Sequence, residues 1–124
     1  MNVLAGKITE SEYEVMKVLW QNGVPMPVTD IRRILHERKG WEATTVKTLI
    51  ARLVDKGAVL QEKRNVFYYS PNISEEAYNN WATGNLIHRL YQGSAKNLVA
   101  ALVQSEELTD QDISELRKMF RVEE

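Results

Sequence analysis

The feature that most limits the fold of this chain is a succession of three short helical segments followed by one β-hairpin. Each helical segment ends at a glycine, a residue that readily takes the left-handed conformation found just after a helix. The capping box Thr9-Glu10-Ser11-Glu12 marks the start of the first helix, and Thr29 is the expected N-cap of the second. Because amphipathic helices bury one face each, the three are expected to pack on one another. The three glycines are Gly23, Gly40 and Gly57.

The third helix is expected over residues 43–56, and its two sides differ. Its apolar residues lie within one narrow arc, which predicts a side that faces the core. Two β-prone runs follow, over residues 58–62 and 66–69, and the turn Lys63-Arg64-Asn65 joins them. Three helices followed by a two-stranded ribbon are typical of a winged helix-turn-helix domain, which we expect over residues 1–73. The core-facing residues of the third helix are Val46, Leu49, Ile50 and Leu53.

A second, purely helical region is expected over residues 74–124. Its three helices are expected to begin after Ser74, after Ser94 and at the capping box that opens with Thr109. Helices of this length expose apolar faces that one chain cannot cover, so we expect a homodimer. The fold class is therefore mostly α with a small β-hairpin, a winged domain followed by a three-helix dimerisation region. The predicted dimer contacts are Leu86, Ile87, Leu90, Tyr91, Leu98, Val99, Leu102, Val103, Ile113, Leu116 and Phe120.

Charge is distributed unevenly between these regions, although the whole chain of 124 residues has a net charge of only −1. Residues 1–72 hold 11 Lys or Arg and 8 Asp or Glu, a net charge of +3. Residues 73–124 hold 5 and 9 of these, a net charge of −4. A basic first region is typical of a surface that meets a polyanion; ordinary scatter of surface charge is the alternative.

The composition excludes several kinds of site. The chain has no cysteine, so disulfides, zinc–thiolate sites, iron–sulfur clusters and thiol catalysis are ruled out. Neither His36 nor His88 has a partner at a metal-ligand spacing, and the sequence has no glycine-rich phosphate loop or nucleophile elbow. We therefore expect no catalysis, no metal and no cofactor. No apolar run is long enough to span a bilayer and the N-terminus lacks the pattern of a signal peptide, so we expect no membrane insertion and a cytoplasmic location.

The side of the third helix that points away from its apolar arc is suited to the major groove of DNA. Small side chains at its centre allow close approach to base edges, and an arginine on its flank can reach phosphate or guanine. The two basic residues of the hairpin turn would then lie near the sugar-phosphate backbone. The alternative is an ordinary solvated helix face beside a charged turn. The predicted DNA-binding residues are Thr44, Thr45, Lys47, Thr48, Arg52, Lys63 and Arg64.

Several segments together carry a family likeness: residues 12–20 (EYEVMKVLW), residues 41–53 (WEATTVKTLIARL), Lys56-Gly57-Ala58, Tyr91-Gln92-Gly93-Ser94 and Leu116-Arg117-Lys118. They resemble the penicillinase-repressor family, the BlaI and MecI group with its copper-responsive CopY relatives. The resemblance covers nearly the whole chain. It implies a homodimeric winged-helix repressor that binds a palindromic operator and controls β-lactam-resistance or related stress genes. It also implies that the family's DNA-contacting positions map onto Thr44, Thr45, Thr48 and Arg52, with Lys47 beside them.

Departures from the family bear on how DNA would be released. The resemblance implies a membrane sensor protease as a partner that acts on the repressor. The Asn-Phe pair that is cut in the family corresponds here to Ala101-Leu102, so this candidate cleavage site has neither residue of the family's pair. The cysteine cluster of the copper-responsive relatives is absent, which excludes copper release by that route. Glu42-Ala43 also stands where the family commonly has Ser-Pro, and this places a negative charge at the start of the third helix.

The alternative function is a winged-helix module that binds another protein and has no sequence-specific affinity for DNA. It is favoured by the nearly neutral net charge and by Glu42 and Asp55, which lie near the supposed DNA-binding face. A mobility-shift assay against DNA from upstream of the chain's own gene would separate the two functions.

Overall fold

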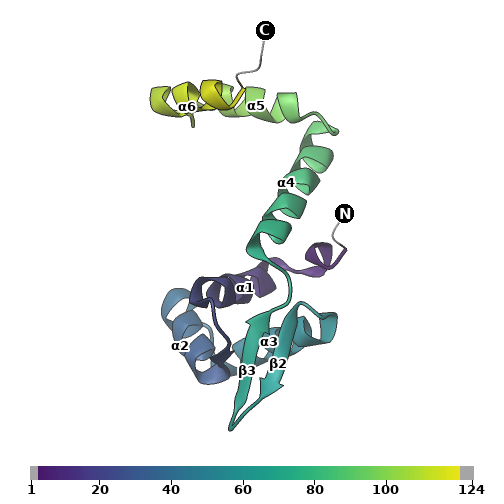
Figure 1. The fold of residues 1–124 in the computed structure, drawn as a ribbon, viewed down its shortest axis with the longest axis vertical. Coiled ribbons are helices and arrows are strands. Elements are labelled where there is room, and N and C mark those ends of the chain that lie inside the picture. Colours follow the sequence, from purple (N-terminus) through teal and green to yellow (C-terminus); the bar gives the residue numbers. More distant parts are fainter. Residues whose placement is uncertain (1–2, 121–124) are drawn as a thin grey trace. The chain divides into compact units, whose positions relative to one another are not determined.

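The structure, a computed structural model, describes residues 3–120 of the chain. The chain divides into two compact units, one that extends to Thr83 and one that begins at Gly84. The first unit contains η1 (Ala5–Lys7), α1 (Glu10–Asn22), β1 (Met26–Pro27), α2 (Val28–Lys39), α3 (Ala43–Lys56), β2 (Val59–Lys63), β3 (Phe67–Pro71) and the beginning of α4 (Glu75–Tyr91). The second contains the end of α4, α5 (Ala95–Gln104) and α6 (Asp110–Phe120) (Figure 1).

The helices of the first unit end where the glycines predict, but α2 begins differently. In α1 the capping box forms completely: the Thr9 hydroxyl accepts the Glu12 amide at 3.2 Å, and the Thr9 amide donates to Glu12 Oε1 at 3.0 Å. The prediction of Thr29 as the N-cap of α2 is wrong. Pro27 takes that position, with extended backbone angles and no capping side chain. Pairing of β1 with the hairpin holds Pro27 extended, so the helix begins at the next residue.

The hairpin is part of a three-stranded antiparallel sheet with the order β1-β3-β2. Lys63 pairs with Phe67, so the turn is Arg64-Asn65-Val66, one residue later than predicted. The Arg64 amide donates to the Val66 carbonyl at 2.9 Å across this turn. The two-residue strand β1 pairs with β3 at Tyr69 and Tyr68. It therefore joins the segment before α2 to the middle of β3.

The core of the first unit lies where α1, α2 and α3 meet, in contact with the base of the sheet. All four residues predicted to face the core from α3 are buried. Burial of each large aliphatic side chain contributes about 1.5–3 kcal/mol of transfer free energy, which fixes the rotation of α3 and turns its other side outward. The largest fully buried apolar side chains are Met16, Leu19, Ile31, Leu35 and Leu53, with Val15 and Val46.

One charged group is also buried in this unit. The Glu12 side chain is 1% exposed, and its Oε1 accepts from Lys56 Nζ at 2.6 Å. The same ammonium donates to the Lys7 carbonyl at 2.8 Å. Because Lys56 is the last residue of α3, this ion pair joins the end of α3 to the beginning of α1.

An aromatic cluster connects the beginning of α4 to α1. The Tyr78 ring stacks on Tyr13 with 5.0 Å between centroids, and its centroid lies 5.8 Å from that of Trp20 and 5.9 Å from that of Trp81. The Trp20 indole N–H donates to the Ile73 carbonyl at 2.8 Å. The first turns of α4 therefore complete the first unit.

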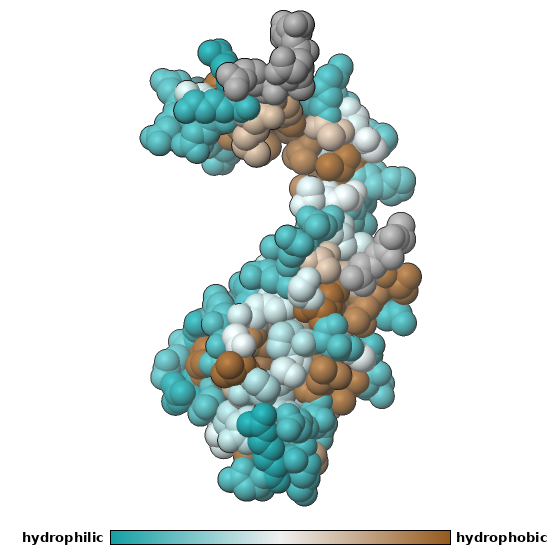
Figure 2. Space-filling model, in the orientation of Figure 1, coloured by the Kyte–Doolittle hydropathy of each residue, from teal (hydrophilic) through white to brown (hydrophobic). Residues whose placement is uncertain are grey.

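The second unit has well-formed helix ends but no buried core. The Ser94 hydroxyl caps α5 by accepting the Asn97 amide at 3.2 Å. Thr109 and Asp112 form a complete capping box for α6, with both bonds at 3.0 Å. No described residue of α5 or α6 is buried. Figure 2 shows apolar side chains gathered on the surface of these helices; the most exposed are Val103 at 54%, Met119 at 78% and Phe120 at 68%.

Candidate nucleic-acid interface

The position of α3 is set by its apolar side and by its two ends. The helix begins after Glu42, whose side chain makes no cap, so the first amides of α3 have no side-chain partner there. It ends at Gly57, whose backbone is left-handed with φ 84° and whose amide donates to the Leu53 and Val54 carbonyls. Since Val46 and Leu53 are fully buried, the opposite side of the helix faces solvent.

The outward face of α3 contains a shallow depression bordered by small hydroxyl side chains. The Thr48 hydroxyl donates to the Thr44 carbonyl at 2.9 Å, which leaves the lone pairs of its oxygen available to an outside donor. Arg52 is exposed and has no ion pair or hydrogen bond among the described side chains. A guanidinium in this state is available for a bidentate contact with phosphate or a guanine edge. The depression is lined by Thr44, Thr45, Thr48, Leu49 and Arg52.

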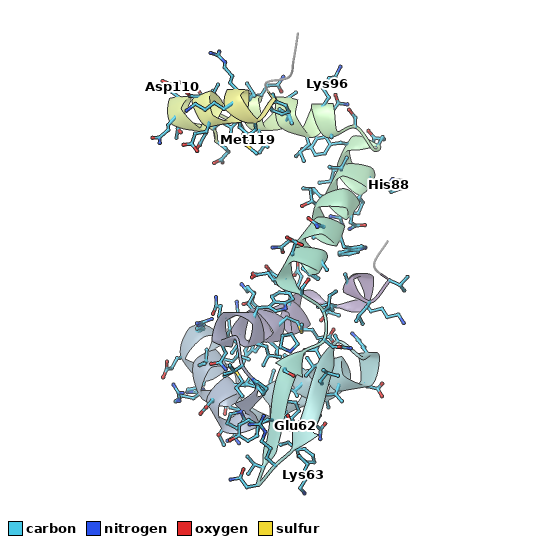
Figure 3. All side chains as sticks on the ribbon, in the orientation of Figure 1. Glu62, Lys63, His88, Lys96, Asp110 and Met119 are labelled. Carbon is cyan, nitrogen blue, oxygen red and sulfur yellow. The ribbon has the colours of Figure 1, made fainter. Side chains whose placement is uncertain are left out.

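The two basic residues predicted at the hairpin tip rest on aromatic rings of the hairpin. Lys63 Nζ lies 5.1 Å from the centre of the Phe67 ring, and the Arg64 guanidinium lies 4.5 Å from that of Tyr68. Arg64 also contacts Glu62 at 3.3 Å, but both side chains are exposed and such pairs contribute little. Figure 3 shows Lys63 near the tip of the hairpin, and Figure 2 shows that this tip is hydrophilic. Both cations therefore remain accessible to a polyanion.

Lys47 lies on the other flank of α3, toward the sheet. It is exposed and forms no ion pair with any residue between 3 and 120. Together with Val54 of α3 and Tyr69 of β3 it borders a groove between α3 and the hairpin. Burial raises the pKa of Tyr69 above its ordinary value, so the hydroxyl of this residue keeps its proton at neutral pH. The structure thus places all seven predicted DNA-binding residues at the surface of α3 and the hairpin, and their contacts with DNA stay a prediction.

A basic pocket beside the start of α3 was missed by the sequence analysis. Arg32 and Arg33 of α2 border it together with His36, and its other wall is formed by Trp41, Glu42 and Ala43. The Nε atom of Arg32 is buried and has no hydrogen-bond partner within the described part of the chain. Arg33 lies 3.8 Å from Asp30 in an exposed ion pair. The consecutive arginines on the helix before α3 were the signal in the sequence that could have revealed this pocket.

Two acidic side chains lie near these cations. Glu42 precedes α3 and Asp55 lies in its last turn, and both are exposed. Neither forms an ion pair with the described basic side chains. The basic character of the face is therefore local, and it is greatest around Arg52, Lys63 and the arginine pair of α2.

The described residues show neither a metal centre nor a membrane span. Between residues 3 and 120, no three His, Asp or Glu side chains are grouped so as to hold a metal ion. Over the same range, no helix has the length and apolar character needed to cross a bilayer.

Comparison with known proteins identifies relatives over nearly the whole chain. The family model described as penicillinase repressor matches residues 8–121. The penicillinase repressor of Bacillus licheniformis is 31% identical over 115 residues, which are 92% of this chain and 89% of that protein. The methicillin resistance regulatory protein MecI of Staphylococcus aureus strain N315 is 32% identical over 115 residues, 92% of this chain and 93% of that protein.

A solved structure gives the same result for the fold. It is the solution structure of monomeric BlaI from Bacillus licheniformis in complex with the blaP half-operator. This chain matches it with a TM-score of 0.52 and 36% identity, over 58% of this chain and 88% of that one. The predicted fold class and the resemblance to the repressor family are confirmed.

Proposed function

The chain belongs to the penicillinase repressor family, and from this premise we propose that it represses transcription by binding a palindromic DNA operator as a homodimer. The observation that carries the proposal is the outward face of α3. Its threonine-lined depression and the exposed Arg52 form a surface of small side chains and a guanidinium that faces solvent. A relative with 36% identity is a repressor solved in complex with half an operator.

In this proposal α3 lies in the major groove, which is about 12 Å wide and admits one helix. Thr44 and Thr48 approach the base edges because they are short, while Arg52 contacts guanine or phosphate. Lys63 and Arg64 contact the backbone or the adjacent minor groove from the hairpin tip. The arginine pair of α2 adds phosphate contacts beside the N-terminus of α3, where the helix dipole also favours a negative group.

Dimerisation supplies the second half of the operator. The apolar side chains of α5 and α6 are exposed in the single chain, and Leu102, Val103 and Phe120 are 39%, 54% and 68% exposed. Contact with a second copy of the chain covers these side chains and removes their apolar area from water. A two-fold dimer then reads two half-sites about one helical turn apart, roughly 34–36 Å.

The genes and the release route are the finer parts of the proposal. We propose that the controlled genes confer β-lactam resistance or a related stress response, that the protein acts in the cytoplasm, and that it catalyses no reaction. A membrane sensor protease is the partner suggested by the family. Its candidate cut between Ala101 and Leu102 falls inside the hydrogen-bonded helix α5, so α5 would have to open before a protease could bind an extended segment.

The test is a fluorescence-anisotropy titration of the full chain with duplex DNA from upstream of its own gene. We expect two chains per inverted repeat, and an affinity that falls with salt in proportion to the phosphates contacted. Arg52→Ala is expected to weaken binding by about 1–3 kcal/mol while the far-UV circular dichroism stays unchanged. Arg89→Ala, an exposed arginine of α4, is the matched control and should bind as the unmodified chain does. One chain per site, or affinity independent of salt, would contradict the proposal.

A protein-binding module is the second candidate function. Its specific support is that the exposed Glu42 and Asp55 have no ion-pair partner among the described side chains and lie at the two ends of α3. Under this alternative, the upstream DNA binds no better than unrelated DNA of equal length. The same titration with a shuffled duplex therefore separates the two functions.

A further inference from the structure

A groove runs between α3 and the hairpin. Its volume is about 460 Å³, within the roughly 300–1,000 Å³ of pockets that hold small organic ligands. Its walls belong entirely to the first unit. The residues that determine its chemistry are Lys47, Ala51 and Val54 on α3, and Gln61, Phe67 and Tyr69 on the hairpin.

The groove is open because a small residue on α3 faces large residues that remain partly exposed on the hairpin. Ala51 contributes only a methyl group to the α3 side. On the hairpin, Val66 is 50% exposed and Phe67 is 39% exposed. Apolar surface left in contact with water costs free energy in proportion to its area. An apolar molecule in the groove would remove that area from water.

The charged groups at the rim are all of one sign. Lys47 lines the groove and has no ion-pair partner among residues 3–120. The Lys63 ammonium lies 5.1 Å from the centre of the Phe67 ring that forms part of the wall. No Asp or Glu is among the described residues that line the groove. The complementary ligand therefore has an apolar body and one negative charge.

We propose that this groove binds an amphipathic organic anion, an aromatic or aliphatic body with one carboxylate, and that the bound anion weakens DNA binding. Binding of the anion is argued from the groove alone, whereas its effect on DNA binding rests on the proposed function. Lys47 and Ala51 belong both to the groove and to the side of α3 that faces DNA in that function. A carboxylate held by Lys47 neutralises a cation otherwise available to phosphate, and it adds a negative charge beside the DNA backbone.

The binding test uses 1-naphthoate and its neutral analogue 1-naphthalenemethanol, titrated into the isotope-labelled full chain while amide NMR shifts are recorded. We expect a Kd for naphthoate on the order of 1 mM or tighter, with the largest shifts at Val54, Gln61 and Phe67. The neutral analogue should bind about tenfold more weakly, because it lacks the charge-assisted contact. Equal affinities, or shifts confined to α5 and α6, would overturn the proposal.

Two substitutions assign the site. Lys47→Met keeps an unbranched apolar stem and removes the charge. Naphthoate and the neutral analogue should therefore bind this variant with about equal affinity. Val54→Phe fills the groove and should abolish the shifts, whereas Val24→Phe, at a position that is 63% exposed and outside the groove, should leave them unchanged. Should Val54→Phe fail to fold, Gln61→Trp on the exposed hairpin fills the same space. Naphthoate binding that persists in the filled, folded variant overturns the assignment.

The regulatory half is tested by repeating the DNA titration at constant ionic strength with saturating naphthoate. The Kd for DNA is expected to rise several-fold in the unmodified chain and to stay constant in Val54→Phe. An unchanged Kd in the unmodified chain, with the groove occupied, overturns the regulatory half. If no DNA binds under any condition, the proposed function fails and the regulatory half fails with it, while the NMR titration still decides whether the groove binds the anion.

Discussion

The two units of this chain differ in how they bury apolar surface. In the first unit the helices α1, α2 and α3 cover one another, and side chains such as Met16, Leu35 and Leu53 are almost completely buried. In the second unit no described residue of α5 or α6 is buried, although both helices are well capped. Local helix signals thus form the helices in both regions, but only the first region has a core of its own. We infer that the second unit obtains its stability from association.

The largest expected effect comes from a cavity in the core of the first unit. Leu53→Ala removes a fully buried side chain and should lower the free energy of unfolding by about 2–5 kcal/mol. Urea unfolding followed by tryptophan fluorescence measures this, because Trp20, Trp41 and Trp81 all precede Gly84. Met119→Ala, at a methionine of α6 that is 78% exposed and outside the predicted dimer contacts, is the control in the second unit and should change the value by less than about 0.5 kcal/mol. Equal losses in both variants would remove the contrast between the units.

The second prediction concerns the association that the second unit is expected to need. Val103→Asp places a charge on an apolar position of α5 that is 54% exposed, and it should weaken dimerisation about a hundredfold because the carboxylate must be desolvated in the dimer. Sedimentation equilibrium measures this change. Ser114→Asp on α6, an exposed polar position, adds the same charge and serves as the control. If Val103→Asp leaves the dissociation constant of the dimer unchanged, Val103 does not lie in the dimer interface.

A smaller effect is expected at the Glu12–Lys56 ion pair, which is largely buried. Lys56→Met leaves the Glu12 carboxylate, 1% exposed, without its ammonium partner. The loss should be about 1–3 kcal/mol, less than for a fully buried pair because Lys56 remains partly exposed. Lys17→Met removes the more exposed pair with Glu14 and should cost below about 0.5 kcal/mol. If the two variants unfold at the same urea concentration, the ion pair of the buried Glu12 stabilises the fold no more than the exposed pair of Lys17 with Glu14.

The smallest effect is a pH dependence confined to the first unit. Desolvation by burial raises the pKa of Tyr78, and the nearby Tyr13 and Glu10 raise it further. The unfolded chain ionises this phenol at about pH 10, whereas the folded chain holds the proton to higher pH. The associated stability is therefore fully present below pH 10 and is lost as the pH rises through the folded pKa. Urea midpoints at pH 8 and pH 10.5 measure this loss, which Tyr78→Phe should reduce and Tyr91→Phe should not.

Much of the fold could be predicted because local signals dominate it. The prediction of α3 over residues 43–56 is confirmed at both ends, since an amphipathic period and a terminal glycine act within the helix itself. The error at Thr29 has a tertiary cause: β1 pairs with β3, and this pairing keeps Pro27 extended, so that α2 begins at Val28, two residues before the start that a Thr29 cap would give. A two-residue strand has no periodicity to detect. The predicted domain boundary between residues 73 and 74 stays a prediction.

The candidate site divides in the same way. The outward position of Thr48 and Arg52 follows from helical spacing alone. The pocket around Arg32 and the hairpin groove do not, because each is lined by segments that come together only when α2, α3 and the sheet pack. The ion pair of Glu12 with Lys56 joins residues 44 positions apart and has no local signal either.

The order of the sheet determines how stiff the hairpin is along its length. Beside Tyr68 and Tyr69, β3 is hydrogen-bonded on both sides, since β1 pairs with these two residues while β2 pairs along the other edge of β3. Beyond Phe67 only the turn Arg64-Asn65-Val66 remains, held by its own hydrogen bonds. Strand pairing thus restrains the body of the hairpin, and its flexibility is concentrated in the turn. A cation carried at such a tip can follow an irregular partner surface, whereas side chains on the rigid α3 require that surface to match them.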